Sequence, residues 1–126
     1  MVHMFLNGGA MRGGPLHDML RGAPLVAEIN TAPMYRFYSV GDRYPALDPV
    51  SAGGRAVAGE LYDMPLDVLH ASLLPNEPPE LELSVIRLAD GTASLSMVLR
   101  PNLRGSSELV DISEVGSWNA YQEARA

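Results

Sequence analysis

FLNGGAMRGGPLHDML, at residues 5–20, decides the fold, because an apolar strand runs directly into a glycine-rich turn and then into a helix. Glycines at Gly8 and Gly9 permit backbone angles that other residues avoid, so amide N–H groups can converge there on an anion. Proline is tolerated at the first helical position, so we expect a helix to begin near Pro15. The glycine spacing matches neither GxxxxGK[ST] nor GxGxxG, and both a tight structural turn and a ligand-binding loop are consistent with it.

Length and composition predict a single domain over residues 1–126, with 47% hydrophobic and 19% charged residues. The formal charge of −6 argues against a nucleic-acid or anionic-membrane partner. The chain has no cysteine and its three histidines are dispersed, so we expect no disulfide, no thiol nucleophile, no metal site and no cofactor. No apolar run is long enough to span a membrane and no signal-peptide pattern is visible, so we expect a cytoplasmic protein.

Strands alternating with turns predict an α+β domain whose sheet curls or closes into a barrel. The expected strands lie at residues 2–6, 34–40, 55–62, 81–88 and 92–99, and the last two form a hairpin around Asp90 and Gly91. A helix is expected after Asp63, and a short terminal helix should place Trp118 and Tyr121 on one face. Residues 22–31 are expected to be a connection with some strand character.

Prolines interrupt the segment at residues 44–49, YPALDP. Each proline removes a backbone donor and restricts the residue before it, so this segment is expected to be an irregular loop. Such a loop could close over a pocket, and Tyr44 and Pro45 are therefore candidate lid residues.

Carboxylates are the remaining candidates for acid–base chemistry, since cysteine and clustered histidines are missing. Glu77 lies in a corner stiffened by prolines, which would hold its carboxylate in place, although an exposed loop charge is the simpler interpretation. Glu60 is the second candidate carboxylate; it could equally face solvent or pair with Arg36 or Arg55. Tyr62 is a core aromatic residue or a pocket wall.

The sequence resembles the gamma-glutamylcyclotransferase-like superfamily, and within it most resembles the carboxy-terminal domain of allophanate hydrolases. Five segments carry the resemblance and cover nearly the whole chain: FLNGGAMRGGPLHDML at 5–20, TAPMYRFYSV at 31–40, GGRAVAGELYDMP at 53–65, LLPNEPPELELSVIRLADGT at 73–92 and DISEVGSWNAY at 111–121. The resemblance implies a small mixed β-barrel with flanking short helices and a pocket where the first strand ends in the glycine loop.

In cyclotransferases that loop typically reads Tyr-Gly-Ser or Tyr-Gly-Thr, and its backbone amides hold the substrate. The resemblance implies substrate contacts from the matching loop here, which comprises Asn7, Gly8, Gly9, Ala10 and Met11. It also implies that Glu77, just after a helix, is the acid–base group that moves a proton as a gamma-glutamyl amide closes to 5-oxoproline. Allophanate hydrolase domains usually lack this carboxylate and tend to carry a histidine where this chain has Ala10.

Two functions follow as hypotheses. The first is an enzyme acting on a gamma-glutamyl amide or a similar carboxylate-bearing amide, with Glu77 as general acid/base and the loop at residues 7–11 holding the substrate. The second is a non-catalytic ligand-binding or assembly module that serves an amidase partner. The two differ in whether Glu77 shares a cavity with the loop. An exposed apolar surface could also support a homodimer.

Overall fold

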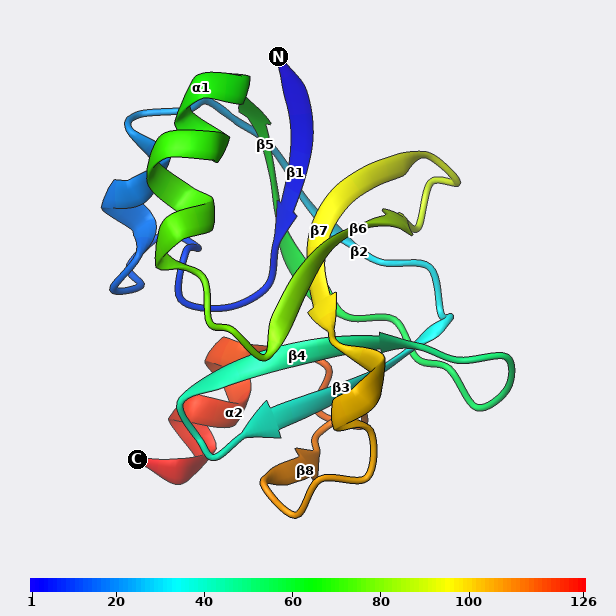
Figure 1. Ribbon diagram of the computed structural model, residues 1–126. Coiled ribbons are helices and arrows are strands. Elements are labelled where there is room, and N and C mark those ends of the chain that lie inside the picture. Colours follow the sequence, from blue (N-terminus) through cyan, green and yellow to red (C-terminus); the bar gives the residue numbers. More distant parts are fainter.

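The computed structural model describes all residues from Met1 to Ala126 and contains two β-sheets (Figure 1). The five-stranded sheet has the order β2-β5-β1-β7-β6, and the three-stranded sheet has the order β4-β3-β8. The strands are β1 (Val2–Leu6), β2 (Leu25–Asn30), β3 (Tyr35–Val40), β4 (Tyr44–Pro49), β5 (Ala58–Met64), β6 (Leu81–Arg87), β7 (Ala93–Leu99) and β8 (Leu109–Asp111).

Strand β1 is the centre of the larger sheet because it pairs antiparallel with β5 and parallel with β7. Met4 and Phe5 are consecutive, so their side chains point to opposite faces of the sheet, and the complete burial of both shows that β1 is covered on both faces. The central position of β1 fixes the place where its last residue, Leu6, leads into the glycine loop. The loop therefore starts from the central strand of the five-stranded sheet.

The hairpin of β6 and β7 is confirmed in its register, since Leu83 faces Met97 and Val85 faces Leu95. The alternating apolar residues do not all face the core, however. Leu83 and Val85 are exposed, whereas Ile86, one position out of phase with them, is buried. Sequence alternation identified the paired positions but could not say which face of the hairpin packs inward.

The segment at residues 44–49 is strand β4 and not the irregular loop that its prolines suggested. β4 is an edge strand, paired only with β3. The N–H of Val50 donates to Met34 O, so even-numbered positions direct their backbone groups toward β3. Pro45 and Pro49 are odd-numbered and lie at positions whose missing N–H would point away from the sheet, where proline is tolerated.

Helical structure is shorter and less regular than the sequence predicted. The expected helix near Pro15 is a 3-10 turn, η1 (His17–Leu20), and the longer helical segment is a composite: α1 (Leu66–Val68), a π-helical turn η2 (Leu69–Leu73) and a 3-10 turn η3 (Leu74–Asn76). Asp63 does not cap this segment; it belongs to β5. The segment lies beside β1 and β5 in Figure 1.

A third 3-10 turn, η4 (Pro101–Leu103), leads toward β8, and the last element is α2 (Trp118–Arg125). The Trp118 and Tyr121 rings do share one face of α2, with ring centroids 5.7 Å apart, and Trp118 is buried in the main core. The α+β class is confirmed, but the two sheets remain separate and do not close into a true barrel. None of the helices combines the length and the apolar composition needed to cross a membrane.

Candidate functional site

A cavity of about 270 Å³ opens where the glycine loop, strand β4 and the segment after η3 meet. This volume suits a small ligand, near the lower end of the range for small-molecule sites. Its lining comprises Phe5, Leu6, Asn7, Gly8, Gly9, Ala10, Pro15, Leu16, Arg43, Tyr44, Pro45, Asn76, Glu77, Pro78, Leu81, Ser96 and Met97. Glu77 and four of the five predicted loop residues therefore line the same cavity.

The loop that lines this cavity carries backbone donors without a partner in the protein. The N–H groups of Gly8, Gly9 and Ala10 donate no hydrogen bond within the protein, whereas the N–H of Met11 donates to Gly8 O. The turn itself is closed by further backbone bonds, including Leu16 N–H to Gly9 O at 2.9 Å. Unpaired donors on an ordered loop are available to an oxyanion or carbonyl oxygen.

Gly8 is required by a close approach and not by unusual backbone angles. A Cβ at this position would lie 2.7 Å from Cδ of Pro45, so only glycine lets the loop pass against strand β4. Its φ is not positive; among the four glycines of residues 8–14, only Gly13 has a positive φ. The loop is therefore shaped by its packing against Pro45. Because η1 is only a short 3-10 turn, it does not provide the loop with the N-terminus of an α-helix.

Asn7 occupies the first position of the loop, and its Nδ2 atom is buried without a hydrogen-bond partner. A buried amide donor normally finds a partner, because leaving it unpaired costs about 1–3 kcal/mol. Asn7 also lines the cavity, but its Nδ2 atom is itself buried, so this donor is not exposed to a ligand there.

Glu77 is half-buried, directly after η3, and its side chain forms no hydrogen bond or ion pair. Its own N–H donates to Leu74 O at 3.1 Å, and Pro78 follows it, so the backbone at this position is constrained on both sides. Burial raises the pKa of the Glu77 carboxyl to about 7. The group is therefore present in both protonation states near neutral pH, as a proton shuttle must be.

Tyr44 and Pro45 line the cavity from the beginning of strand β4. The Tyr44 hydroxyl donates to Glu80, and desolvation together with this carboxylate raises the pKa of Tyr44 above its usual value. Arg43, immediately before β4, lines the same cavity. Sequence reasoning missed Arg43, because nothing in the local pattern brings residue 43 near residue 77.

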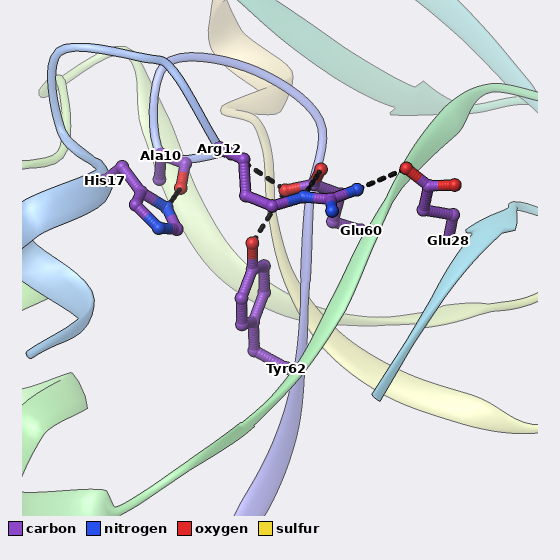
Figure 2. Close-up of polar contacts among 6 residues, drawn as sticks. All are labelled: Ala10, Arg12, His17, Glu28, Glu60 and Tyr62. Carbon is purple, nitrogen blue, oxygen red and sulfur yellow. Dashed lines mark hydrogen bonds and ion pairs between the residues drawn. The ribbon is translucent and has the colours of Figure 1, made fainter. Parts of the chain in front are cut away.

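Three other predicted site residues lie outside this cavity. Met11 and Glu60 line a separate, shallower hollow, and Tyr62 is almost fully buried behind the glycine loop. Glu60 pairs with neither Arg36 nor Arg55; its partner is Arg12, which the sequence analysis had not singled out (Figure 2).

Glu60 anchors the carboxy-terminal end of the glycine loop. Its carboxylate accepts hydrogen bonds from Arg12 N–H at 2.9 Å, Arg12 Nε at 2.8 Å and the Tyr62 hydroxyl at 2.7 Å. Figure 2 shows the Arg12 side chain between Glu60 and Glu28, with which it also forms an ion pair. Desolvation raises the pKa of Glu60, but these hydrogen bonds outweigh it, and the net pKa is lowered.

His17 supports the loop from the other side. Its Nδ1 lies 3.0 Å from Ala10 O, and its ring packs at a tilt against Tyr62, with centroids 6.0 Å apart (Figure 2). Two independent contacts, from Glu60 and from His17, therefore hold the loop whose N–H groups remain free. This arrangement separates the groups that position the loop from the groups that line the cavity.

One mixed and one antiparallel sheet, with short helices and a cavity at the end of β1, define an α+β domain. The family of allophanate hydrolase C-terminal domains matches residues 2–123, and the protein belongs to that family. A comparison with curated protein sequences gave no significant match.

Solved structures share this fold. The protein c4763, described as specific to uropathogenic E. coli, is 34% identical over 97% of this chain and 95% of its own, with a TM-score of 0.89. Kluyveromyces lactis allophanate hydrolase is 24% identical, with a TM-score of 0.90 over 99% of this chain. The present chain spans only about a fifth of that enzyme, 21% of its length. An AIG2-like protein from Mus musculus is 17% identical, with a TM-score of 0.59 and 81% of each chain covered.

Proposed function

We propose that this protein is an enzyme of gamma-glutamylcyclotransferase type, acting on a gamma-glutamyl amide or a similar carboxylate-bearing amide. One observation carries the proposal: the unpaired carboxyl of Glu77, with a pKa of about 7, lines the same cavity as the free N–H groups of the glycine loop. A proton-transfer group and an oxyanion cradle around one small cavity are the two parts that intramolecular amide exchange requires.

In the proposed reaction the substrate's amine attacks the carbonyl carbon of its own amide, and a new C–N bond closes the ring. The Glu77 carboxylate takes the proton that the attacking nitrogen loses, while the N–H groups of Gly8, Gly9 and Ala10 stabilise the negative oxygen. The C–N bond to the leaving amine then breaks, and Glu77 returns the proton to that nitrogen. Protons balance over the cycle, and Glu77 ends in its starting state.

The test is turnover of gamma-glutamyl amides, followed as release of the free amine. Glu77→Gln keeps the shape of the side chain but cannot exchange the proton, so we expect turnover to fall by about 10²–10⁴-fold. For the wild type, kcat/KM should rise with pH around a midpoint near 7, since the ionised carboxylate is the reactive form.

Glu82→Gln is the matched control, because Glu82 is a carboxylate on β6 outside the cavity lining and pairs only with Arg100. It should retain wild-type turnover and the same pH profile. Full activity of Glu77→Gln, or a pH profile without an inflection near 7, would contradict the proposal.

A second candidate is a ligand-binding or assembly module that works with an amidase partner. It is favoured by the occurrence of the same fold within the chain of K. lactis allophanate hydrolase. Under this hypothesis the protein would co-purify with an amidase, and Glu77→Gln would leave that association unchanged. Turnover by the isolated protein that depends on Glu77 would decide in favour of the enzyme.

A further inference from the structure

We propose that Arg43 binds a carboxylate of the substrate at the cavity, and thereby selects amides that carry a negative charge at a distance from the reacting carbonyl. The inference rests on the proposed function and assigns a specificity-determining residue to the same site. Arg43 is the only cationic side chain among the 17 residues that line the cavity.

The contacts of Arg43 within the protein leave it available to a ligand. Its Nη2 lies 3.4 Å from Glu108 Oε1, and both side chains are more than half exposed, so this ion pair contributes little. The guanidinium also lies over the Tyr44 ring, 5.4 Å from its centroid. That stacking places the guanidinium beside Tyr44, another residue of the cavity lining, and leaves its hydrogen-bond donors mostly unused.

The cavity lining carries hydrogen-bond donors that have no partner in the protein. The free N–H groups of Gly8, Gly9 and Ala10 are donors, and Arg43 adds a charged one. The only acidic side chain in the lining is Glu77, which burial keeps partly protonated. A ligand that carries hydrogen-bond acceptors therefore matches these donors.

The donors also form two groups on different elements. The loop donors follow β1 in the five-stranded sheet, whereas Arg43 precedes β4 in the three-stranded sheet. The Arg43 N–H donates to Val40 O, which closes the turn at 3.1 Å and fixes its backbone. The loop donors alone could bind a ligand that has one acceptor group. Arg43, on the other sheet, therefore corresponds to a second acceptor group on the ligand. A guanidinium matches a carboxylate in shape and charge, so we assign this second group as a carboxylate.

The experiment measures binding with turnover blocked. The Glu77→Gln variant is titrated by calorimetry with gamma-L-glutamyl ethylamide and with its alpha-carboxamide, in which a neutral amide replaces the carboxylate. We expect the acid to bind about tenfold or more tightly than the carboxamide, because a charge-assisted hydrogen bond to a carboxylate is among the strong ones. The preference should shrink at high salt.

Adding Arg43→Gln to the Glu77→Gln variant should remove the preference, because it weakens binding of the acid but not of the carboxamide. Arg43→Lys in the same background should keep part of the preference, because lysine retains the positive charge. Arg55→Gln is the matched control, since it changes the net charge equally and Arg55 is exposed and lies outside the cavity lining. It should leave both affinities unchanged.

Equal affinities for the two compounds, no binding of the acid, or an equal loss of both with Arg43→Gln would each overturn the inference. These outcomes are separate from a failure of the proposed function. That failure would appear as full turnover by Glu77→Gln, whereas the binding preference for the carboxylate does not depend on catalysis.

Discussion

Glu77 is an acidic side chain that the fold holds half-buried without a partner, which is unfavourable for stability. Its pKa of about 7 lies above the ordinary value of 4.5, so between these two pH values the folded protein holds a proton that the unfolded chain releases. The stability that this group contributes is therefore present below about pH 4.5 and is lost as the pH rises through 7.

This linkage predicts the behaviour of Glu77→Gln in urea unfolding. At about pH 4 the variant and the wild type should have similar free energies of unfolding, because both side chains are neutral in both states. At about pH 8 the variant should be more stable by up to about 3 kcal/mol, since it lacks the buried charge. If the difference in free energy of unfolding between the variant and the wild type stays constant from about pH 4 to about pH 8, the Glu77 carboxyl is well solvated.

Glu60 illustrates the opposite use of a carboxylate. It was a candidate for chemistry in the sequence, but its oxygens are occupied by Arg12 and Tyr62, and it lies outside the cavity. The structure therefore indicates a positioning role: Glu60 fixes the backbone of residue 12 and so the end of the glycine loop.

Glu60→Gln should lower the free energy of unfolding by about 1–3 kcal/mol, because buried hydrogen bonds to charged groups are lost or weakened. Glu28→Gln is its matched control: Glu28 pairs with the same arginine, but its side chain is 73% exposed, so its loss should change stability by less than about 0.5 kcal/mol. Chemical denaturation of both variants makes the comparison. Equal effects would show that the burial of the Glu60 pair is unimportant.

At the scale of elements, the contact between the glycine loop and strand β4 sets the shape of the cavity. Gly8→Ala would place its Cβ 2.7 Å from Cδ of Pro45, on a strand with little freedom to move. We expect a loss of about 1–3 kcal/mol in the free energy of unfolding, as for other overpacked sites, together with weaker ligand binding.

Gly9→Ala provides the control for this prediction, because its Cβ would lie 3.5 Å from Pro15, an ordinary contact. Gly9→Ala should leave the free energy of unfolding unchanged or raise it slightly, because alanine lowers the conformational entropy of the unfolded chain. Combining Gly8→Ala with Pro45→Ala should recover part of the lost stability by removing the clash. Full tolerance of Gly8→Ala alone would argue against the close approach.

The elements that sequence patterns predicted are those whose stability is local. The hairpin turn at residues 90–91, the aromatic strand β3 and the terminal helix α2 each follow from neighbouring residues. Strand β4 was missed because proline was judged without knowing that β4 lies at an edge, and the three-residue β8 carries too little pattern to predict. The helix after β5 was expected, but not its π-helical turn.

The residues of the candidate site likewise divide into those that local sequence could identify and those that depend on distant contacts. The glycine loop could be found from local sequence, whereas the role of Glu77 came from the resemblance to a family. Arg12 and Arg43 could not be found, because each acts through contacts with residues more than 30 positions away: Glu60 for Arg12, and the cavity around Glu77 for Arg43. Spacing along a chain carries no information on such contacts.

At the scale of the whole molecule, the cavity lies where the two sheets meet. Phe5, Leu81 and Ser96 line it from β1, β6 and β7, and Tyr44 lines it from β4 in the other sheet. Strand β4 packs against β7, so the two sheets are in direct contact beside the cavity (Figure 1).

Because the cavity walls come from both sheets, a bound molecule connects parts of the chain that separate on unfolding. Ligands of the site should therefore raise the melting temperature, with about 2.7 kcal/mol of stabilisation at a concentration 100 times the dissociation constant. Differential scanning fluorimetry against a small-metabolite library would detect this, and hits that lose their effect in Arg43→Gln would be assigned to the cavity. Heat resistance thus becomes a readout for the natural substrate, even before any reaction product is known.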